Sequence, residues 1–366
     1  MVSSTQERCL MPETESIPQK SIMKLSHLIH GFQLGRSALY FLESQPLPII
    51  RKIFDPSSRN TTGRLGKMDQ YSFQLVNQLL KQDALNITEG LYPLTVLELE
   101  RPAPHFKRLL KIFADAAFMA RRRNNKASKA FSRKAKQWLE DLPEYYQRNF
   151  HYQTDGYLSK KSAEIYEHQV ELLFAGTANA MRRSILRPLK DQFKSHPTGR
   201  GLRFLEVACG RGTFTKYLAQ AFPEAEIVAM DLSHPYLQVA KDHLRAFPRV
   251  SIQQGKAEDL PFKDATFDAV VSVFLFHELP LEVRKQVLAE SHRVLKETGL
   301  AAMVDSIQMH DDSNFEWALQ EFPKSFHEPF YKNYVNHPME ELFSTSGFSQ
   351  IETGRAFLSK YLTAQK

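Results

Sequence analysis

The sequence predicts an α/β fold over its C-terminal half, preceded by a mainly helical N-terminal domain. Three observations support the α/β part. The apolar run at residues 204–207 has the pattern of a buried strand, and Gly210 and Gly212 form a tight turn directly after it. A helical pattern follows over residues 214–221, and Asp231 stands at the end of the next strand pattern. This is the order of a βαβ unit that binds a nucleoside, in which the acid accepts the ribose hydroxyls.

The glycine turn favours one class of nucleoside. A dinucleotide fingerprint would need a third glycine where Thr215 stands, so that pattern is incomplete. Glu206 lies just before the turn, where its carboxylate would repel a pyrophosphate and attract an ammonium group. S-adenosyl-L-methionine has no phosphate, carries a sulfonium cation and ends in an amino acid. The sequence therefore predicts S-adenosyl-L-methionine as the cofactor.

Two further segments, residues 254–262 (QGKAEDLPF) and 267–280 (FDAVVSVFLFHELP), give the chain a family resemblance. With the glycine turn, they make it resemble the class I S-adenosylmethionine-dependent methyltransferases. The resemblance is closest to the branch of the ubiquinone and menaquinone C-methyltransferases and covers roughly residues 200–310. It implies a Rossmann-like seven-stranded methyltransferase sheet and an enzyme that transfers a methyl group.

The resemblance also implies residue roles. In the family the glycine turn contacts the methionyl part, the acid after strand two binds the ribose, the segment after strand three flanks the adenine, and strand four ends beside the methyl group. Carried over, the cofactor-binding residues are Glu206, Gly210, Gly212, Asp231, Leu232, Ala257, Glu258, Phe274 and Leu275. Relatives usually have Asp where Lys256 stands. Lysine offers only donors, so a contact with the adenine amino group must be lost or made by Glu258 or Asp259.

Three residues are predicted to be catalytic. His277 follows strand four, Asp305 ends strand five, and His327 lies in an insertion at residues 310–334. A base that titrates near neutral pH suits an acceptor that must lose a proton. We expect all three to point into one cavity, although His277 could instead orient its loop and His327 could belong to a turn. No metal site is predicted, since the candidate ligands at residues 310–312 lie in a polar loop.

The chain is expected to divide into four parts: a disordered tail (1–20), a helical N-terminal domain (21–144), a helical lid or connector (145–198) and a Rossmann-like methyltransferase domain (199–366). Within the helical part, residues 22–54 are expected to form short helices interrupted by glycines and prolines. In the connector, Tyr152 and Tyr157 either close the cofactor site or attach the N-terminal unit to the core.

Charge and cysteine content limit the partners. The net charge of +7 combines +12 over residues 1–200 with −5 over the rest, and residues 121–136 carry eight cations and no acid. That block suits nucleic acid or a lipid surface, but a solvated helix face or a junction between two helices is favoured. Only two cysteines and no long apolar run at the start predict a cytoplasmic protein without a transmembrane segment.

The predicted function is therefore in-line methyl transfer to a small-molecule acceptor. Neither Gly-Pro-Pro-Tyr nor Asn-Pro-Pro-Tyr follows strand four, which counts against most DNA-adenine and protein-glutamine methylation. Two alternatives remain open: an RNA or protein methyltransferase that docks its substrate on the basic N-terminal region, and an inactive module that only binds the donor. The sequence leaves open the acceptor, the atom methylated and the oligomeric state.

Overall fold

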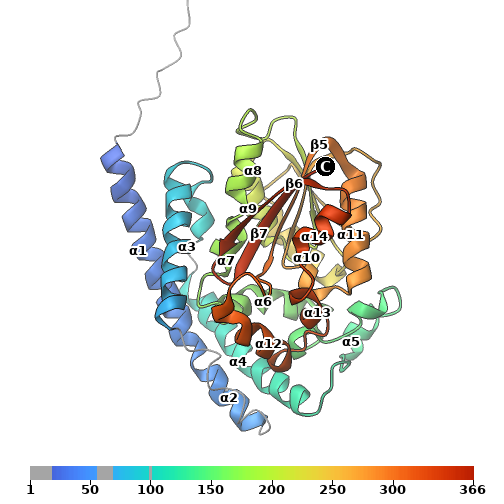
Figure 1. Ribbon diagram of the computed structural model, residues 1–366. Coiled ribbons are helices and arrows are strands. Elements are labelled where there is room, and N and C mark those ends of the chain that lie inside the picture. Colours follow the sequence, from blue (N-terminus) through green and yellow to red (C-terminus); the bar gives the residue numbers. More distant parts are fainter. Residues whose placement is uncertain (1–18, 56–68, 99–100) are drawn as a thin grey trace, which may run out of the picture.

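A computed structural model describes residues 19–55, 69–98 and 101–366 of the chain. Its centre is a seven-stranded sheet with the order β3-β2-β1-β4-β5-β7-β6 (Figure 1). The pairs β1–β2, β1–β4, β2–β3 and β4–β5 are parallel, whereas β7 runs antiparallel to β5 and β6. The strands are β1 (Arg203–Val207), β2 (Glu226–Asp231), β3 (Val250–Gln254), β4 (Phe267–Val273), β5 (Leu295–Ser306), β6 (Ser349–Ala356) and β7 (Ser359–Gln365). The predicted Rossmann-like fold is confirmed.

Helices flank this sheet, and a helical part precedes it. Before β1 the described helices are α1 (Gln19–Ser44), α2 (Pro46–Phe54), α3 (Gln70–Thr88), η2 (Leu94–Leu97), α4 (Pro102–Asn124), α5 (Arg133–Lys136), η3 (Glu144–Tyr146), η4 (Phe150–Tyr152), α6 (Lys160–Leu173), α7 (Ala178–Arg183) and α8 (Leu186–Gln192), where η denotes a 3-10 helix. Between and after the strands they are α9 (Thr213–Ala221), α10 (His234–Leu244), η5 (Phe276–Glu278), α11 (Leu281–Val294), η6 (Ser313–Phe315), α12 (Glu316–Ser325), α13 (Tyr331–Val335) and α14 (Met339–Thr345).

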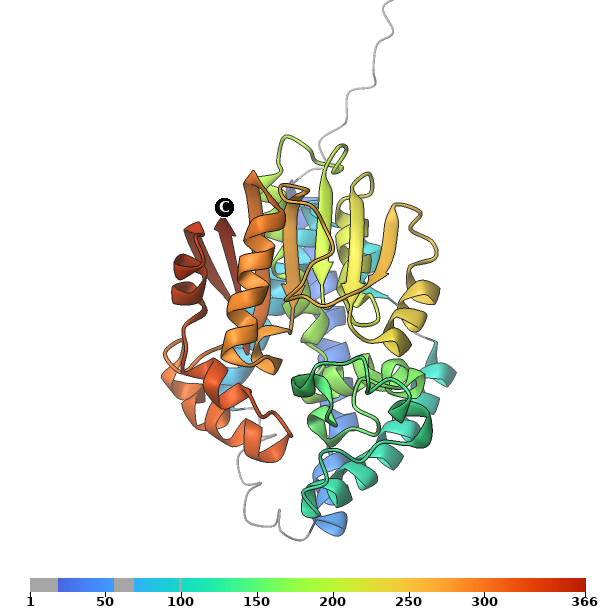
Figure 2. The same ribbon diagram turned by 90° about the vertical axis from the view of Figure 1, so that its right-hand side faces the viewer.

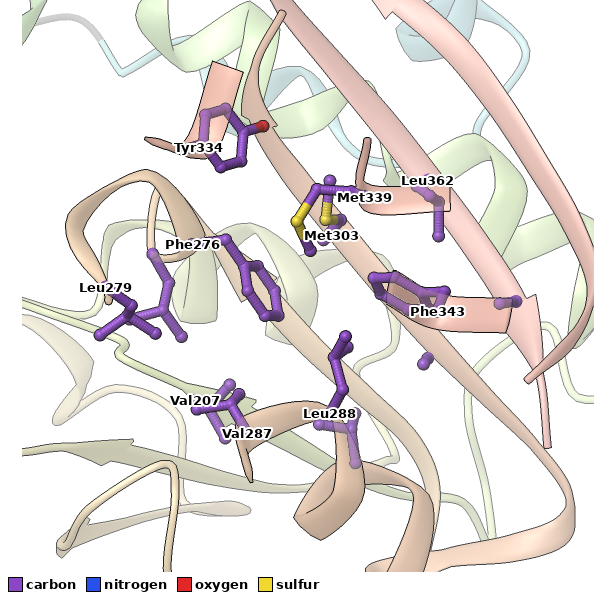
Figure 3. Close-up of a cluster of buried hydrophobic side chains, with 14 of the residues drawn as sticks. Val207, Phe276, Leu279, Val287, Leu288, Met303, Tyr334, Met339, Phe343 and Leu362 are labelled. Carbon is purple, nitrogen blue, oxygen red and sulfur yellow. The ribbon is translucent and has the colours of Figure 1, made fainter. Parts of the chain in front are cut away.

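The parallel strands are apolar on both faces because helices cover both. Neighbouring residues of a strand point to opposite sides of a sheet, so Phe204 and Leu205 of β1 belong to two different hydrophobic clusters. Phe204 packs with residues of α8 and α9. Leu205 belongs to the cluster shown in Figure 3, in which Val287 and Leu288 of α11 and Phe343 of α14 meet the sheet. The sheet is therefore held rigidly between two layers.

The first helix differs from the expectation for residues 22–54. Instead of short helices broken at Gly31 and Gly35, α1 runs through both glycines without interruption, and only the prolines of α2 follow a break at Gln45. Ile29 and Tyr40 are buried where α1 packs beside α3 and α6. This packing outweighs the low helix propensity of glycine. The predicted tail at residues 1–20 lies almost wholly outside the described residues.

The connector and the C-terminal insertion lie at the same end of the sheet. Figure 2 shows the green segment that contains α6 and the orange-red segment that contains α12 and α13 below the strands, at the end where the strand arrows point. Parallel α/β sheets bind their ligands at this carboxyl end. Both segments therefore stand over the edge where a ligand would bind.

A buried ion pair joins the helical part to the connector. Arg183 of α7 donates from Nε to Oδ1 of Asp83 at 2.9 Å and from a terminal nitrogen to Oδ2 at 2.6 Å. Asp83 lies in α3 and also accepts a hydrogen bond of 2.7 Å from the hydroxyl of Tyr92. Both charged side chains are almost fully buried. Such a pair fixes geometry, because either charge left alone would be expensive to keep out of water.

We therefore expect Asp83→Ala to lower the free energy of unfolding by about 3–5 kcal/mol, since it leaves the Arg183 guanidinium buried and unpaired. The matched control is Glu89→Ala, which removes the partner of the more exposed Arg187 and should cost about 0–1 kcal/mol. Urea unfolding followed by circular dichroism measures both. Equal losses in the two variants would contradict the importance of the Asp83–Arg183 pair.

Candidate functional site

The glycine turn between β1 and α9 has the backbone shape that its sequence predicts. Gly210 and Gly212 both have positive φ, at 55° and 80°. At Gly212 a β-carbon would also lie 2.6 Å from a methyl carbon of Leu244, so a side chain is excluded by both conformation and space. The turn therefore brings bare backbone to the carboxyl edge of the sheet.

A cavity lies at this edge and gathers most of the predicted cofactor-binding residues. Eight of the nine line it: Glu206, Gly210, Asp231, Leu232, Ala257, Glu258, Phe274 and Leu275. The ninth, Gly212, is not among the lining residues and shapes the turn behind them. Phe274 has a φ of 58°, a rare conformation for a residue with a side chain, which turns the chain sharply after β4.

Asp231 holds two loops of the cavity together. Its Oδ2 accepts a hydrogen bond of 2.8 Å from the backbone of Gly210, and its Oδ1 accepts one of 2.7 Å from the backbone of Ser233. Burial raises the pKa of Asp231 to about 6 in spite of these bonds. A carboxylate has lone pairs for about four hydrogen bonds, so two hydroxyl donors can still be accepted.

Glu206 is a buried carboxyl group with unused bonding capacity. Its Oε2 has no hydrogen-bond partner, and burial raises the pKa of Glu206 to about 8. The hydroxyl of Thr213, which also lines the cavity, is likewise without a partner. A cationic group in the cavity would relieve the cost of ionising Glu206, so these two side chains fit the amino-acid end of S-adenosylmethionine.

Lys256, which stands where relatives usually have Asp, does not line the cavity, whereas the nearby Glu258 does. Lys256 instead pairs with Asp259 through the backbone. Glu258 lines the cavity and accepts a hydrogen bond of 2.8 Å from the hydroxyl of Tyr145. A carboxylate oxygen thus stands on the cavity wall although the residue usual in relatives is replaced.

One wall of the cavity comes from residues that the sequence analysis did not predict as ligands. It is built largely from aromatic rings of the connector and of α10: Tyr145, Tyr146, Phe150, Tyr157, Tyr166 and Tyr236. Arg182 of α7 also lines the cavity, where it pairs with Glu167 at 3.0 Å and lies over the ring of Phe274. Of the two tyrosines considered, Tyr157 lines the cavity and Tyr152 does not. In the sequence, the mixed aromatic and polar composition of residues 145–158 was the one feature that could have indicated this wall.

Two of the three predicted catalytic residues lie together. Nδ1 of His277 is 2.5 Å from Oδ1 of Asp305, and the backbone nitrogens of Phe276 and Ser306 also donate to this carboxylate. Burial alone would lower the pKa of His277, but the adjacent Asp305 raises it to about 9. His277 is therefore an imidazolium at neutral pH. Neither residue lines the cavity; Glu278, which follows His277, does.

Glu278 lies between two histidines. Its Oε1 is 4.0 Å from Nε2 of His277 and 3.5 Å from Nε2 of His151, and it accepts a short hydrogen bond from the hydroxyl of Tyr157. On its other side, His151 Nδ1 is 2.8 Å from the buried carboxylate of Glu328. Acidic and basic groups thus alternate from Asp305 through to Glu328. The two carboxylates contact opposite nitrogens of His151 and, against the effect of burial, raise the pKa of its ring to about 10, so they hold an imidazolium.

The third predicted catalytic residue lies apart from this row. The ring of His327 packs against that of Tyr152, 5.2 Å between centroids, and its carbonyl accepts a hydrogen bond from the backbone of His151. Burial and the nearby Arg148 lower the pKa of His327. The structure thus brings His277 and Asp305 together and places His327 behind His151, so the expectation that all three point into one cavity is not met.

Besides His151, Glu278 and Glu328, a second cluster of histidine and carboxylate side chains lies in the helical part of the chain. Nε2 of His105 and Nε2 of His168 face the carboxylate of Glu43, at 2.8 Å and 3.6 Å. Burial lowers the pKa of His168 to about 3, so its ring is neutral. At residues 310–312, Asp312 instead bonds to Arg355 and to the hydroxyl of Tyr71.

The chain is similar to known proteins. Residues 204–299 match a family described as a methyltransferase domain. An uncharacterised methyltransferase of Synechocystis sp. is 33% identical over 153 residues, covering 41% of this chain and 68% of that one. A demethylmenaquinone methyltransferase of Lysinibacillus sphaericus is 34% identical over 119 residues, covering 32% of this chain and 50% of that one. The crystal structure of the CurJ carbon methyltransferase aligns over 94% of this chain and 96% of its own, with 14% identity and a TM-score of 0.49.

The family match and the Synechocystis relative agree with the cavity in pointing to S-adenosylmethionine as the methyl donor. Among the described residues, no helix is long and apolar enough to cross a membrane. The chain belongs to the class I S-adenosylmethionine-dependent methyltransferases, near the menaquinone methyltransferase branch.

Proposed function

We propose that this chain transfers the methyl group of S-adenosylmethionine to a small, largely apolar acceptor with an acidic proton, inside the cavity at the carboxyl edge of the sheet. The observation that supports this most is the aromatic wall. Tyr146, Phe150, Tyr157 and Tyr166 come from the connector and stand over the strand ends, so the cavity is roofed by rings rather than open to a basic groove. A roofed apolar cavity favours a small molecule over a nucleic acid.

The donor would be held by groups that now lack partners or have capacity to spare. We assign Glu206 to the ammonium group, Arg182 to the carboxylate and Asp231 to the ribose hydroxyls. Glu258, held by Tyr145, is assigned to the adenine amino group. Bound in this way, the donor supplies an activated methyl group, and the task of the protein is to align the acceptor and exclude water.

The acceptor side of the cavity carries one carboxylate among apolar groups. Phe274, Leu275 and Leu279 line it beside Glu278. We assign Glu278 to the acceptor proton, because it is the group of the alternating row that reaches the cavity wall. His277 and Asp305 then act as positioning residues, since the ring of His277 lies 4.0 Å from Glu278 and Asp305 holds that ring from its other side. His327 supports His151 from behind.

A phenol or an enol of a reduced quinone meets these requirements, being flat, apolar and weakly acidic. The name of the Lysinibacillus relative points to the same chemistry, so demethylmenaquinol is the first acceptor to test. The assay is release of S-adenosylhomocysteine that depends on the added acceptor. Turnover with an RNA or a protein extract, and none with small phenols or enols, would contradict the proposal.

The main alternative is substrate docking on the basic block at residues 121–136. Two of its cations are internal: Arg123 Nε lies 2.6 Å from Asp55, and Arg122 donates to the backbone of Tyr152 at 2.6 Å. This agrees with the predicted helix junction. Lys126, Lys129 and Lys134 are exposed and remain available to a polyanion.

Changing those three lysines to Gln should leave turnover on a small acceptor within about two-fold, because exposed cations that do not line the cavity act on it only through fields that salt screens. The measurement is initial rate at low and high salt. The fold-maintaining Arg122 and Arg123 stay unchanged in this variant. Loss of activity in the triple variant, and a steep fall of wild-type activity with salt, would instead indicate docking of a polyanion.

Donor binding should release a proton. Because the pKa of Glu206 is about 8 before binding, about nine tenths of the groups are protonated at pH 7. An ammonium group beside the carboxyl favours its ionised form and lowers that pKa, so up to about one proton should leave. Calorimetry of S-adenosylhomocysteine binding at pH 7, in buffers of different ionisation enthalpy, measures the proton count.

Glu206→Gln should abolish this release and weaken binding, whereas Glu224→Gln, at an exposed carboxylate remote from the cavity, should change neither. Buffer-independent enthalpies in the wild-type protein would contradict the assignment of Glu206 to the ammonium group. Asp231 contributes little to the count, since its pKa of about 6 leaves it mostly ionised at pH 7.

Glu278→Gln should lower kcat by about 10²- to 10⁴-fold while affinity for the donor stays nearly unchanged, because the amide cannot take the acceptor proton. The measurements are steady-state kinetics with demethylmenaquinol and calorimetry with S-adenosylhomocysteine. Glu282→Gln, an exposed neighbour paired with Lys285, is the control and should keep the full rate. Full activity in Glu278→Gln would leave alignment alone as the source of catalysis.

A further inference from the structure

The outer face of α1 and α2 is apolar and unpartnered among the described residues. Leu25, Leu28, Phe32, Leu39 and Leu42 are spaced by three, four, seven and three residues, and each is between 40% and 72% exposed. Gly35 occupies the position that completes the pattern. Figure 1 shows α1 and α2 end to end along the outer edge of the molecule, and Ile49 and Ile53 of α2 continue the same spacing. A repeat of three and four residues is the pattern of a helix that packs along another helix.

The rest of α1 already has partners within the chain. Ile29, Gln33 and Tyr40 are buried where the helix packs beside α3 and α6. Arg36 turns the same way and lies 3.4 Å from Glu171 of α6. Packing inside the chain therefore explains one face of α1 and gives no reason for leucines on the other.

The two glycines of α1 lie on or beside this face. A β-carbon built at Gly31 or at Gly35 would have no atom within 4 Å, so nothing in the described chain requires either glycine. Glycine is among the least favourable residues in the middle of a helix. Two of them four residues apart, with Ala38 beside them, leave a shallow groove in which another helix backbone can approach closely.

We propose that this face binds the same face of a second copy of the chain, with the two α1 helices antiparallel. A two-fold axis beside Gln33 and Leu34 places three complementary contacts in register. Leu25 then lies opposite Leu42, and Leu28 opposite Leu39. Phe32 of each copy lies over Gly35 of the other, where the missing side chain leaves room for the ring.

The size and charge of the face favour a second copy over a lipid surface. At 1.5 Å per residue and about 10 Å across, residues 19–54 offer about 500 Å² in each copy, or about 1,000 Å² in all, the lower range for a specific interface. Helices that lie on membranes carry Lys and Arg along the border of the apolar stripe. Here Lys24 stands at one end of the stripe and Arg51 and Lys52 at the other, and between the two ends Arg36 faces inward, so the middle of the stripe meets its copy without repulsion.

Sedimentation velocity of the full chain over a range of concentrations tests the proposal, with Gly35→Leu as the decisive variant. The open space around Gly35 means that a leucine does not disturb the single copy, yet it fills the groove that receives Phe32. We expect a dimer for the wild type, and a dissociation constant raised at least ten-fold for Gly35→Leu, with affinity for S-adenosylhomocysteine unchanged. Lys285→Leu, which adds a leucine on the exposed side of α11, is the control and should stay dimeric.

The register has its own test in a Cys9→Ser background, which leaves the buried Cys209 as the other cysteine. Leu28→Cys with Leu39→Cys should form covalent dimers under mild oxidation, whereas Leu28→Cys with Leu42→Cys should not. A wild-type chain that is monomeric at every concentration would overturn the proposal, as would a Gly35→Leu chain that dimerises normally. Binding to phosphatidylglycerol vesicles that Gly35→Leu strengthens would assign the face to a membrane instead.

Discussion

Two buried carboxylates set the geometry on which the whole cavity depends. Asp231 ends β2 and holds the backbone of the turn after the neighbouring β1, at Gly210. Asp305 ends β5 and holds the backbone of the turn after the neighbouring β4, at Phe276. In each case an acid at the carboxyl end of one strand accepts an N–H from the loop of the strand beside it. The turn after β1 and the loop that carries Phe274 and Glu278 are thereby fixed to the sheet by contacts within the protein.

Each of these acids has a structural role in addition to the functional role that the sequence predicts. The sequence predicts that an acid after strand two binds the ribose and that an acid after strand five belongs to a catalytic base. The backbone hydrogen bonds show that each also has a structural task, which it performs without ligand. Asp305 is fully buried and contacts the backbone of Phe276, the backbone of Ser306 and the ring of His277, so under the proposed function it acts through that ring. Asp305 thus lies at the predicted end of its strand, but His277 and Glu278 separate it from the cavity.

The sequence allowed prediction of the fold and of the donor side of the cavity, because both depend on local order along the chain. Strand, glycine turn, helix and acid follow one another within about thirty residues, and eight of nine proposed ligands line one cavity. The aromatic wall and Arg182 could not be assigned, since they come from helices whose placement over the sheet is set by tertiary packing. The row from Asp305 to Glu328 likewise joins residues distant in sequence. The unbroken α1 was missed because burial of Ile29 and Tyr40, rather than local propensity, decides its conformation.

The origin of the cavity walls has a consequence for how this protein can change. The floor is supplied by the sheet and its loops, and the aromatic wall by connector residues between Tyr145 and Glu167 together with Tyr236 of α10. In the part of the chain that the structure describes, His151 and Tyr157 contact Glu278 from the connector, through charge and through a hydroxyl. Tyr145 of the same connector holds Glu258, so the connector contacts both the side of the cavity proposed for the donor and the side proposed for the acceptor. Under the proposed function, a change of acceptor with the least effect on donor binding would therefore come from substitutions near His151 and Tyr157 rather than near Tyr145.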